Sequence, residues 1–245
     1  MITIYNIRGT NGSGKSTLAR SFIRGDAAAE PNRYVEGSPI VVDLCWYDAP
    51  TKKDPARRLA VEGYCSPELR PGLDVLVVGS YRTACGGLDA VPNFETTFRA
   101  LDGAVNIHRR YPHSAEHQAI IAEGVLASTV WGSWGEYAQP SLDDESCDVR
   151  FAFCYLDTPL EVCLERIRGR QEAAGKVRDI KTELVADKIK AIKATRERAL
   201  QAGHAVYDLP YETAAPALVA IMTDAMAPNR APFRDTVKAR ELYRA

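Results

Sequence analysis

The feature that most constrains this chain is the segment from Gly9 to Ser16, GTNGSGKS. It satisfies every fixed position of the pattern G-x-x-x-x-G-K-[ST], in which loop amides and a helix N-terminus converge on phosphate oxygens. The apolar run Ile2–Ile7 precedes it as a candidate strand, and Thr17–Arg24 follows it as a candidate helix. Glycine is needed where the backbone wraps closely around an anion. The sequence therefore predicts a phosphate-binding loop between a strand and a helix.

The residues of this loop have distinct expected tasks. Lys15 is expected to bridge the β- and γ-phosphates of ATP, and the Ser16 hydroxyl is expected to coordinate Mg²⁺. The residues expected to bind the nucleotide are Gly9, Thr10, Asn11, Gly12, Ser13, Gly14, Lys15, Ser16 and Thr17. The loop thus predicts ATP and Mg²⁺ as cofactors.

Short apolar runs alternate with helical or irregular stretches along the chain, a pattern typical of a parallel sheet covered on both faces. The candidate strands are Ile2–Ile7, Pro39–Cys45, Asp74–Gly79, Ala119–Glu123, Phe151–Leu156 and Ala205–Leu209. Residues 80–117 show no clear period, and we expect an irregular loop there. With 245 residues, of which 46% are hydrophobic, the chain can bury a full core. We expect a single domain over residues 1–245.

The strongest helix signal follows the fifth apolar run. Thr158 and Glu161 match a T-x-x-E capping box, with Pro159 at the first helical position. A second helix is predicted over about Thr182–Ala202, and one of its faces, within residues 188–198, is rich in lysine and arginine.

Arg166 and Arg170 lie four residues apart on the first of these helices and therefore share a face. We expect them to close over transferring phosphoryl oxygens as a lid-like segment of about 160–180, because arginine clamps recur in phosphoryl transfer. The alternative is a solvated basic helix end, which the helix dipole also favours. A C-terminal tail of about 228–245 is either a terminal helix or a frayed end.

The charge of the chain is nearly balanced, with 31 Lys+Arg against 32 Asp+Glu. This balance disfavours a protein that coats nucleic acid through bulk electrostatics. Residues 160–200 nevertheless hold eleven Lys/Arg against seven Asp/Glu, so positive charge is concentrated around the predicted lid. Apolar runs are too short to span a membrane, and no export signal opens the sequence, so we expect a cytoplasmic protein. No feature predicts an oligomeric state.

A kinase must position and deprotonate an acceptor hydroxyl or phosphate, and ligands of open α/β sheets bind where the strands end. Three acids follow or end apolar runs at such places: Asp43, Asp89 and Glu123. We assign Asp43 as the general base, Glu123 as the acid on the Mg²⁺ side, and Asp89 as the residue that holds the acceptor. An exchange of roles among the three stays open, as does a purely structural role for each.

Through residues 9–16 and 154–170 the chain resembles the nucleoside and nucleotide kinases. The resemblance implies a three-layer P-loop NTPase fold, with a five- to six-stranded, mainly parallel sheet and helices on both faces. It also implies an adenine site near residues 208–211. Three further segments, at 79–89, 123–128 and 156–159, resemble a group of bacteriophage P-loop kinases. Members of that group phosphorylate the exocyclic hydroxyl of 5-hydroxymethyluracil in DNA, as a step toward hypermodified thymine, which implies action in the host cytoplasm.

The phage resemblance also implies an acceptor pocket that includes Cys85, Gly86 and Gly87, with Tyr81 stacked on a base. A base in duplex DNA must be flipped out, and the flanking phosphates must be held. The candidate grips are the basic face at 188–198 and the group Arg109, Arg110, Tyr111 and His113. Trp131 and Trp134 either wall the acceptor site or pack in the core.

Three functions are consistent with the sequence. The first is an ATP-dependent kinase for 5-hydroxymethyluracil in DNA. The second is a kinase for free deoxynucleosides or their monophosphates, which would share the ATP half and differ in the acceptor pocket. The third is a P-loop ATPase or regulatory module that transfers phosphate to no acceptor. It is disfavoured because no second domain or coiled coil is visible to couple hydrolysis to work.

Overall fold

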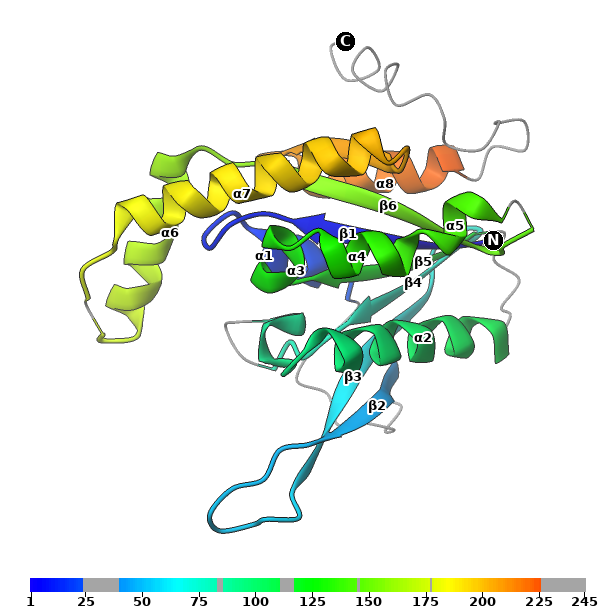
Figure 1. Ribbon diagram of the computed structural model, residues 1–245, viewed down its shortest axis with the longest axis horizontal. Coiled ribbons are helices and arrows are strands. Elements are labelled where there is room, and N and C mark those ends of the chain that lie inside the picture. The colour runs from blue at the N-terminus through cyan, green and yellow to red at the C-terminus, as the bar shows by residue number, and fades with distance from the viewer. Residues whose placement is uncertain (24–39, 83–85, 111–116, 145, 177, 226–245) are drawn as a thin grey trace. The chain divides into compact units, whose positions relative to one another are not determined.

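The computed structural model describes residues 1–23, 40–82, 86–110, 117–144, 146–176 and 178–225, which are coloured in Figure 1. Within these residues seven strands form one sheet in the order β2-β3-β4-β5-β1-β6-β7. β4 pairs with β5 in parallel, as β6 does with β7, whereas β3 pairs antiparallel with both β2 and β4. The predicted α/β class with a mainly parallel sheet is confirmed, with one strand more than the five to six expected.

The strands are β1 (Ile2–Arg8), β2 (Ile40–Asp48), β3 (Arg58–Arg70), β4 (Leu73–Val78), β5 (His117–Glu123), β6 (Val149–Asp157) and β7 (Ala205–Pro210). The helices are α1 (Lys15–Arg20), α2 (Phe94–Arg110), α3 (Val125–Thr129), α4 (Gly132–Ala138), α5 (Pro140–Asp143), α6 (Leu160–Ala173), α7 (Thr182–Gln201) and α8 (Ala214–Ala225), with a short 3-10 helix η1 (Leu88–Ala90). The predicted tail at 228–245 lies outside the described residues.

The chain divides into two compact units. Unit 1 comprises Met1–Ile4, Ser16–Glu123 and Asp148–Arg150, and unit 2 comprises Tyr5–Lys15, Gly124–Cys147 and Phe151–Ala245. No helix among the described residues is long and apolar enough to cross a membrane.

Unit 1 is built on β4 and β5, whose residues are all buried. Helix α2 packs against β2, β4 and β5, although residues 80–117 were expected to be irregular. The buried face of α2 consists largely of small and hydroxyl side chains, which give a weak apolar period: Thr96, Thr97, Ala100, Leu101, Ala104, Val105 and His108. The side-chain oxygen of Asn93 caps this helix by accepting a hydrogen bond from the Thr96 amide at 2.8 Å.

Strand β3 was not predicted, because Gly63, Glu62 and Pro67 interrupt its apolar pattern. Its pairing also changes β2, which was expected to end at Cys45 but continues to Asp48 alongside β3. The two strands form a hairpin with a register shift between Asp43 and Cys45.

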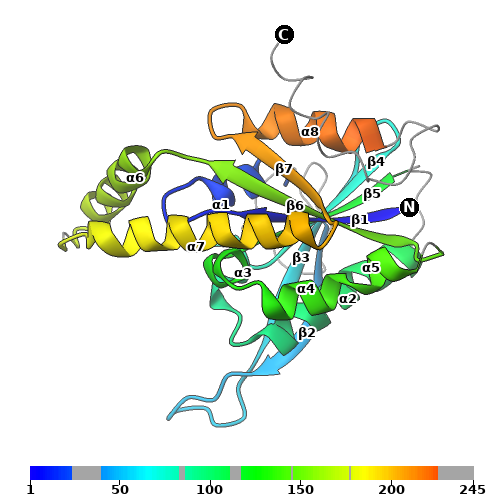
Figure 2. The same cartoon turned by 45° about the horizontal axis from the view of Figure 1, so that its top comes forward.

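Unit 2 contains the parallel pair β6 and β7, with α7 and α8 packed against β7 (Figure 2). Helix α7 confirms the predicted helix within one residue of its expected end. Its buried side chains include Val185 and Ile192 on the predicted apolar face, together with Thr195 and Ala199. Helix α6 contacts α7 and is the helix predicted for the lid-like segment.

Candidate active site

The phosphate loop occupies Gly9–Lys15, between β1 and α1, as predicted. Gly12 and Gly14 have φ angles of 82° and 101°, a region that side chains with a Cβ atom rarely adopt. The Ser13 amide donates to the Thr10 carbonyl at 3.2 Å and closes the turn. The loop therefore has the backbone turns from which successive amides can bind an anion.

Side chains from unit 2 hold both ends of this loop. The Lys15 ammonium donates to the Thr10 carbonyl at 3.1 Å, and Lys15 is buried. The Gly9 amide donates to Ser128 Oγ at 3.1 Å, and Ser128 Oγ donates in turn to the Gly124 carbonyl at 2.6 Å. The loop is thus fixed through a serine hydroxyl far away in the sequence.

The predicted capping box on α6 is wrong. Pro159 is the N-cap residue, and no side chain caps the helix. Thr158, which was expected to pair with Glu161, instead donates from its hydroxyl to the Ser13 carbonyl at 3.0 Å. Its hydroxyl therefore ties the start of α6 to the phosphate loop.

Arg166 also contacts the phosphate loop. Its Nη1 atom donates to the Ser13 carbonyl at 3.2 Å and to the Gly12 carbonyl at 3.4 Å. The guanidinium lies 5.4 Å from the centre of the Tyr211 ring, a cation–π distance. Arg170 is exposed on the same helix, and its part in a clamp stays a prediction.

In unit 1, Ser16 and Glu123 are brought together. Glu123 ends β5 and is fully buried. Ser16 Oγ donates to Glu123 Oε1 at 2.8 Å, and the Tyr81 hydroxyl donates to the same oxygen at 3.5 Å. Hydroxyl and carboxylate oxygens are the hard ligands that Mg²⁺ prefers, so this pair fits the metal expected there.

A chain of hydrogen bonds leads away from Glu123 within unit 1. The Tyr81 amide donates to the Tyr64 hydroxyl at 3.3 Å, and this hydroxyl donates to Glu62 Oε2 at 2.7 Å. Arg82 Nε donates to Glu62 Oε1 at 2.9 Å. Burial, followed by the bond to Glu62, raises the pKa of Tyr64 to about 12. Sequence reasoning missed Glu62 and Tyr64 because both lie on β3.

Tyr81 does not offer its ring to a base, contrary to expectation. The residue is 1% exposed, and its ring meets Tyr64 edge-on with the centres 5.8 Å apart. The Arg20 guanidinium lies 5.6 Å from the centre of the same ring. Burial and the nearby Glu123 hold the pKa of the Tyr81 hydroxyl well above its ordinary value. The hydroxyl is therefore a hydrogen-bond donor to the carboxylate.

The glycine pair predicted for the acceptor pocket packs against this network. A Cβ atom on Gly87 would overlap the Glu123 carboxylate, and one on Gly86 would overlap the Tyr81 ring. Gly87 also has a φ of 75°. Only glycine lets the backbone approach the buried acid this closely. The third predicted pocket residue, Cys85, lies outside the described residues.

The other two predicted acids lie on β2 and on η1, and η1 contacts β5. Asp43 was expected to end its strand but lies within β2, directly opposite Glu62. Its pKa is raised, mainly by burial and next by the negative charge of Glu62, while Arg82 opposes the shift. Asp89 is exposed on η1. Among the described residues, no group of three or more His, Cys, Asp or Glu side chains could hold a metal ion.

No protein-family model matches the chain. The 5-hmdU DNA kinase of Pseudomonas phage M6 is 32% identical over 215 residues, which are 85% of this chain and 91% of that protein. The 5-hmdU DNA kinase of Delftia phage PhiW-14 is 27% identical, over 82% of this chain and 65% of that protein. A 5-hmdU DNA kinase 1 of Salmonella phage ViI is 25% identical, over 76% of this chain and 65% of that protein.

This chain belongs to the family of phage 5-hmdU DNA kinases. The resemblance seen in the motifs is confirmed, and the chain is a kinase. It spans about two thirds of the Delftia and Salmonella relatives, so those proteins carry additional sequence.

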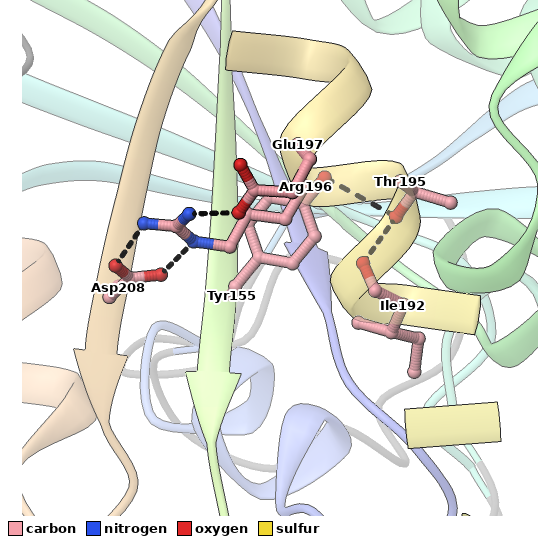
Figure 3. Close-up of polar contacts among 6 residues, drawn as sticks. All are labelled: Tyr155, Ile192, Thr195, Arg196, Glu197 and Asp208. Carbon is pink, nitrogen blue, oxygen red and sulfur yellow. Dashed lines mark hydrogen bonds and ion pairs between the residues drawn. The ribbon is translucent and has the colours of Figure 1, made fainter. Parts of the chain in front are cut away.

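Two arginines predicted to grip DNA are engaged within this kinase. Arg109 pairs with Asp148 through Nε and Nη2, with Nε 3.0 Å from Oδ2. Arg196 on α7 holds Asp208 on β7 in the same two-pronged way, at 2.7 and 2.6 Å (Figure 3). Asp208, near the expected adenine site, is therefore occupied by this ion pair. Arg110, from the same predicted group as Arg109, is exposed, and its contact with DNA stays a prediction. The other two residues of that group, Tyr111 and His113, lie outside the described residues.

The two tryptophans of this kinase pack in the core of unit 2 around a charge that sequence reasoning missed. Trp134 is fully buried, as is Arg8, the last residue of β1. Four rings surround the Arg8 guanidinium at 4.7–5.9 Å from its centre: Trp131, Trp134, Phe153 and Tyr155. The only signal in the sequence was an arginine at the end of an apolar strand, directly before the phosphate loop.

Proposed function

We propose that this kinase transfers the γ-phosphoryl group of ATP, with Mg²⁺, to the hydroxymethyl oxygen of 5-hydroxymethyluracil in DNA. The observation that carries the proposal is the bond from Ser16 to the buried Glu123, because Ser16 directly follows the lysine of the phosphate loop. The names of the phage relatives support the DNA substrate.

The phosphate loop residues supply the nucleotide site in this proposal. The amides of residues 9–15 and the Lys15 ammonium bind the phosphates, and Ser16 with Glu123 holds Mg²⁺. A bound Mg²⁺ neutralises charge on the phosphate oxygens. Arg166 and Arg170 place further positive charge beside the transferring group. Because Arg166 already bonds to two loop carbonyls, it is the better placed of the two.

On the acceptor side, Asp43 takes the proton from the hydroxymethyl group as its oxygen attacks the γ-phosphorus. The new O–P bond forms while the bond to the β-phosphate oxygen breaks, and ADP leaves. The raised pKa of Asp43 makes its carboxylate a stronger base. Asp89 holds the acceptor from the exposed side of η1. The base is flipped out of the duplex, because an enzyme cannot reach its hydroxyl inside the stack.

The test is to incubate the protein and γ-labelled Mg·ATP with four acceptors in parallel. These are DNA that contains 5-hydroxymethyluracil, the same DNA with thymine, free nucleosides and free nucleoside monophosphates. The proposal expects label on the first acceptor alone. Label only on a free nucleoside or nucleotide would contradict the DNA substrate, and release of phosphate with every acceptor alike would indicate an ATPase.

Two variants test the nucleotide side and the acceptor side of the site separately. Lys15→Ala should lose ATP turnover and keep the fold, which circular dichroism checks. Asp43→Asn should lose transfer and keep ATP binding, because its acid acts on the acceptor side. Normal transfer by Asp43→Asn would remove Asp43 from the role of base, and Glu62→Gln is the matched variant on the facing strand.

A further inference from the structure

The hairpin of β2 and β3 ends in an exposed loop, residues 49–57, which both views show projecting away from α2, β4 and β5 (Figures 1 and 2). Hydrogen bonds fold this loop into a defined turn. The Thr51 amide donates to the Asp54 carbonyl at 2.9 Å, and the Asp54 amide donates to Thr51 Oγ1 at 3.0 Å. The Ala49 amide donates to the Arg57 carbonyl at 2.9 Å and closes the base of the loop.

The tip of this hairpin is strongly basic. Residues 46–58 contain four Lys/Arg against two acids, Asp48 and Asp54, and the acids leave an excess of positive charge. Lys52 and Lys53 occupy the turn, and Arg57 is the last residue before β3. All three are exposed and form no ion pair with any described residue. Arg58 faces Asp48 at 3.5 Å in a pair that stays exposed to solvent. By contrast, the opposite end of the same hairpin carries the acids Asp43 and Glu62.

An exposed aromatic side chain lies next to this basic tip. Trp46 is 44% exposed, one of only three large hydrophobic side chains exposed among the described residues. Arg99 of α2 donates to the Trp46 carbonyl at 3.4 Å and adds another exposed cation beside the strand. Cations interleaved with an exposed ring are typical of surfaces that bind nucleic acid backbones and unstacked bases.

We infer that the tip of the β2–β3 hairpin, residues 46–58, binds the phosphate backbone of DNA beside the modified nucleotide. The inference rests on the proposed function, since it names how that substrate is held. Lysine and arginine contacts to phosphate position a duplex without reading its sequence. Two of the other candidate cations, Arg109 and Arg196, are less available, because each forms two hydrogen bonds to one carboxylate.

The length of the hairpin determines how far from Asp43 its tip can contact a DNA phosphate. Five residues separate Asp43 from Asp48, which is about 16 Å at the rise of a strand. Successive phosphates of one DNA strand are about 3.4 Å apart along the helix axis. If the hairpin lies along the duplex axis, its tip therefore reaches phosphates at least about five nucleotides from the hydroxyl that Asp43 deprotonates.

The decisive experiment compares the wild-type protein with the triple variant Lys52→Gln/Lys53→Gln/Arg57→Gln. Duplexes with a central 5-hydroxymethyluracil carry four or fifteen base pairs on each side. For the long duplex we expect the variant to raise KM about tenfold with kcat unchanged, and to reduce the slope of log Kd against log salt by about two to three. For the short duplex, wild type and variant should agree.

Two further variants are matched controls for this comparison. Lys188→Gln/Lys190→Gln/Lys193→Gln on α7 removes the same charge from the other basic face, and its effect on KM should be smaller and independent of duplex length. Lys52→Arg/Lys53→Arg keeps the charge of the tip and should behave as wild type. Thermal unfolding checks that the triple variants are folded.

Equal effects of the two triple variants, or an unchanged KM for the long duplex, would overturn the role of the hairpin while leaving the kinase assignment in place. A wild-type protein that phosphorylates neither duplex would instead overturn the proposed function, and the hairpin inference with it. The short duplex separates these failures, because its phosphorylation depends on the proposed function and not on the tip.

Discussion

Glu123 and Arg8 are both charged, both fully buried and both the last residue of a strand, yet their surroundings are opposite. Glu123, in unit 1, accepts hydrogen bonds from two hydroxyls, those of Ser16 and Tyr81. Arg8, in unit 2, is surrounded by four aromatic rings and bonds to the side chain of Asn6 at 2.7 Å.

Burying a charge costs free energy that its neighbours must offset. Hydroxyls offset it with hydrogen bonds that a metal ion or a phosphate can take over during a reaction, because they reorient at little cost. Aromatic rings offset it through cation–π attraction and close packing. A substrate or metal ion cannot take over these interactions during a reaction. The environment of Glu123 is therefore suited to chemistry, and that of Arg8 to stability.

The ionisation of Arg8 agrees with a structural role. Burial lowers the pKa of its guanidinium to about 10, and the hydroxyl of Tyr155 opposes the shift. The side chain is therefore still charged at neutral pH. No Asp or Glu pairs with it among the described residues, so the rings, Asn6 and the Val130 carbonyl carry its stabilisation.

The largest effect is expected from Glu123→Gln. The substitution keeps the shape of the side chain and removes the charge, so transfer should fall by about a thousandfold, the scale on which single electrostatic groups act in catalysis. The free energy of unfolding should stay within about 1 kcal/mol of wild type. Steady-state kinetics and urea unfolding measure the two quantities. If Glu123→Gln instead lost stability in proportion to activity, the role of Glu123 would be structural, as is expected for Arg8.

The converse is expected of Arg8→Ala. Truncation leaves a cavity among four rings and should lower the free energy of unfolding by about 3 kcal/mol, the lower end of the range for large buried side chains. Transfer per folded molecule should stay within about threefold of wild type. Arg8→Met is the control, since it refills the volume and removes the buried charge, and it should cost less than half as much. A large loss of kcat in Arg8→Met would show that the charge itself serves the reaction.

The parts of the site that have a local sequence pattern were predicted. The phosphate loop, its flanking strand and helix, and Glu123 at the end of β5 were all recognised, because each has a local signature. Thr158 shows the limit of local patterns. Its residue type and spacing matched a capping box, yet its hydroxyl bonds to Ser13, 145 residues away. No local pattern reports a partner at that distance.

The acceptor side of unit 1 was harder to predict for a related reason. β3 carries Glu62 and Tyr64, and its glycine, proline and charged residues hide it from a search for apolar runs. Without β3, the sequence predicts that β2 ends at Cys45, and it does not predict the hairpin with its basic tip. Similarly, α2 was missed because its buried face uses threonine and alanine in place of larger apolar side chains. Pairing with neighbours, rather than local composition, determines these elements.

A pH series tests the aromatic surroundings of Arg8 through His204, which lies against the rings of Trp131 and Phe153. Burial, followed by the charge of Arg8, lowers the pKa of His204 to about 4. Because this folded-state pKa lies below the ordinary value of about 6.5, the unfolded chain binds the proton more tightly between these limits. Stability is therefore full above pH 6.5 and falls as the pH drops toward 4.

Between pH 7 and pH 5 this histidine should cost about 2 kcal/mol of unfolding free energy. His204→Phe should remove that part of the acid sensitivity, and urea unfolding at the two pH values measures it. His117, in unit 1, has a pKa lowered to about 4 as well, mainly by burial, and its contribution should persist in the variant. An unchanged pH dependence in His204→Phe would show that His204 is not buried neutral.

The smallest effect is expected from Tyr81→Phe, which removes one of the two hydroxyls that bond to Glu123. The bond from Tyr81 to Glu123 is long, at 3.5 Å, whereas Ser16 holds the same oxygen at 2.8 Å. Loss of the weaker bond should lower transfer by about three- to tenfold, consistent with about 1 kcal/mol for one hydrogen bond. Ser16→Ala is the matched variant and should lose far more, because its hydroxyl is also the expected metal ligand. If the two variants lost activity equally, Glu123 would depend on its hydroxyls only as hydrogen-bond donors, and the Mg²⁺ role of Ser16 would fail.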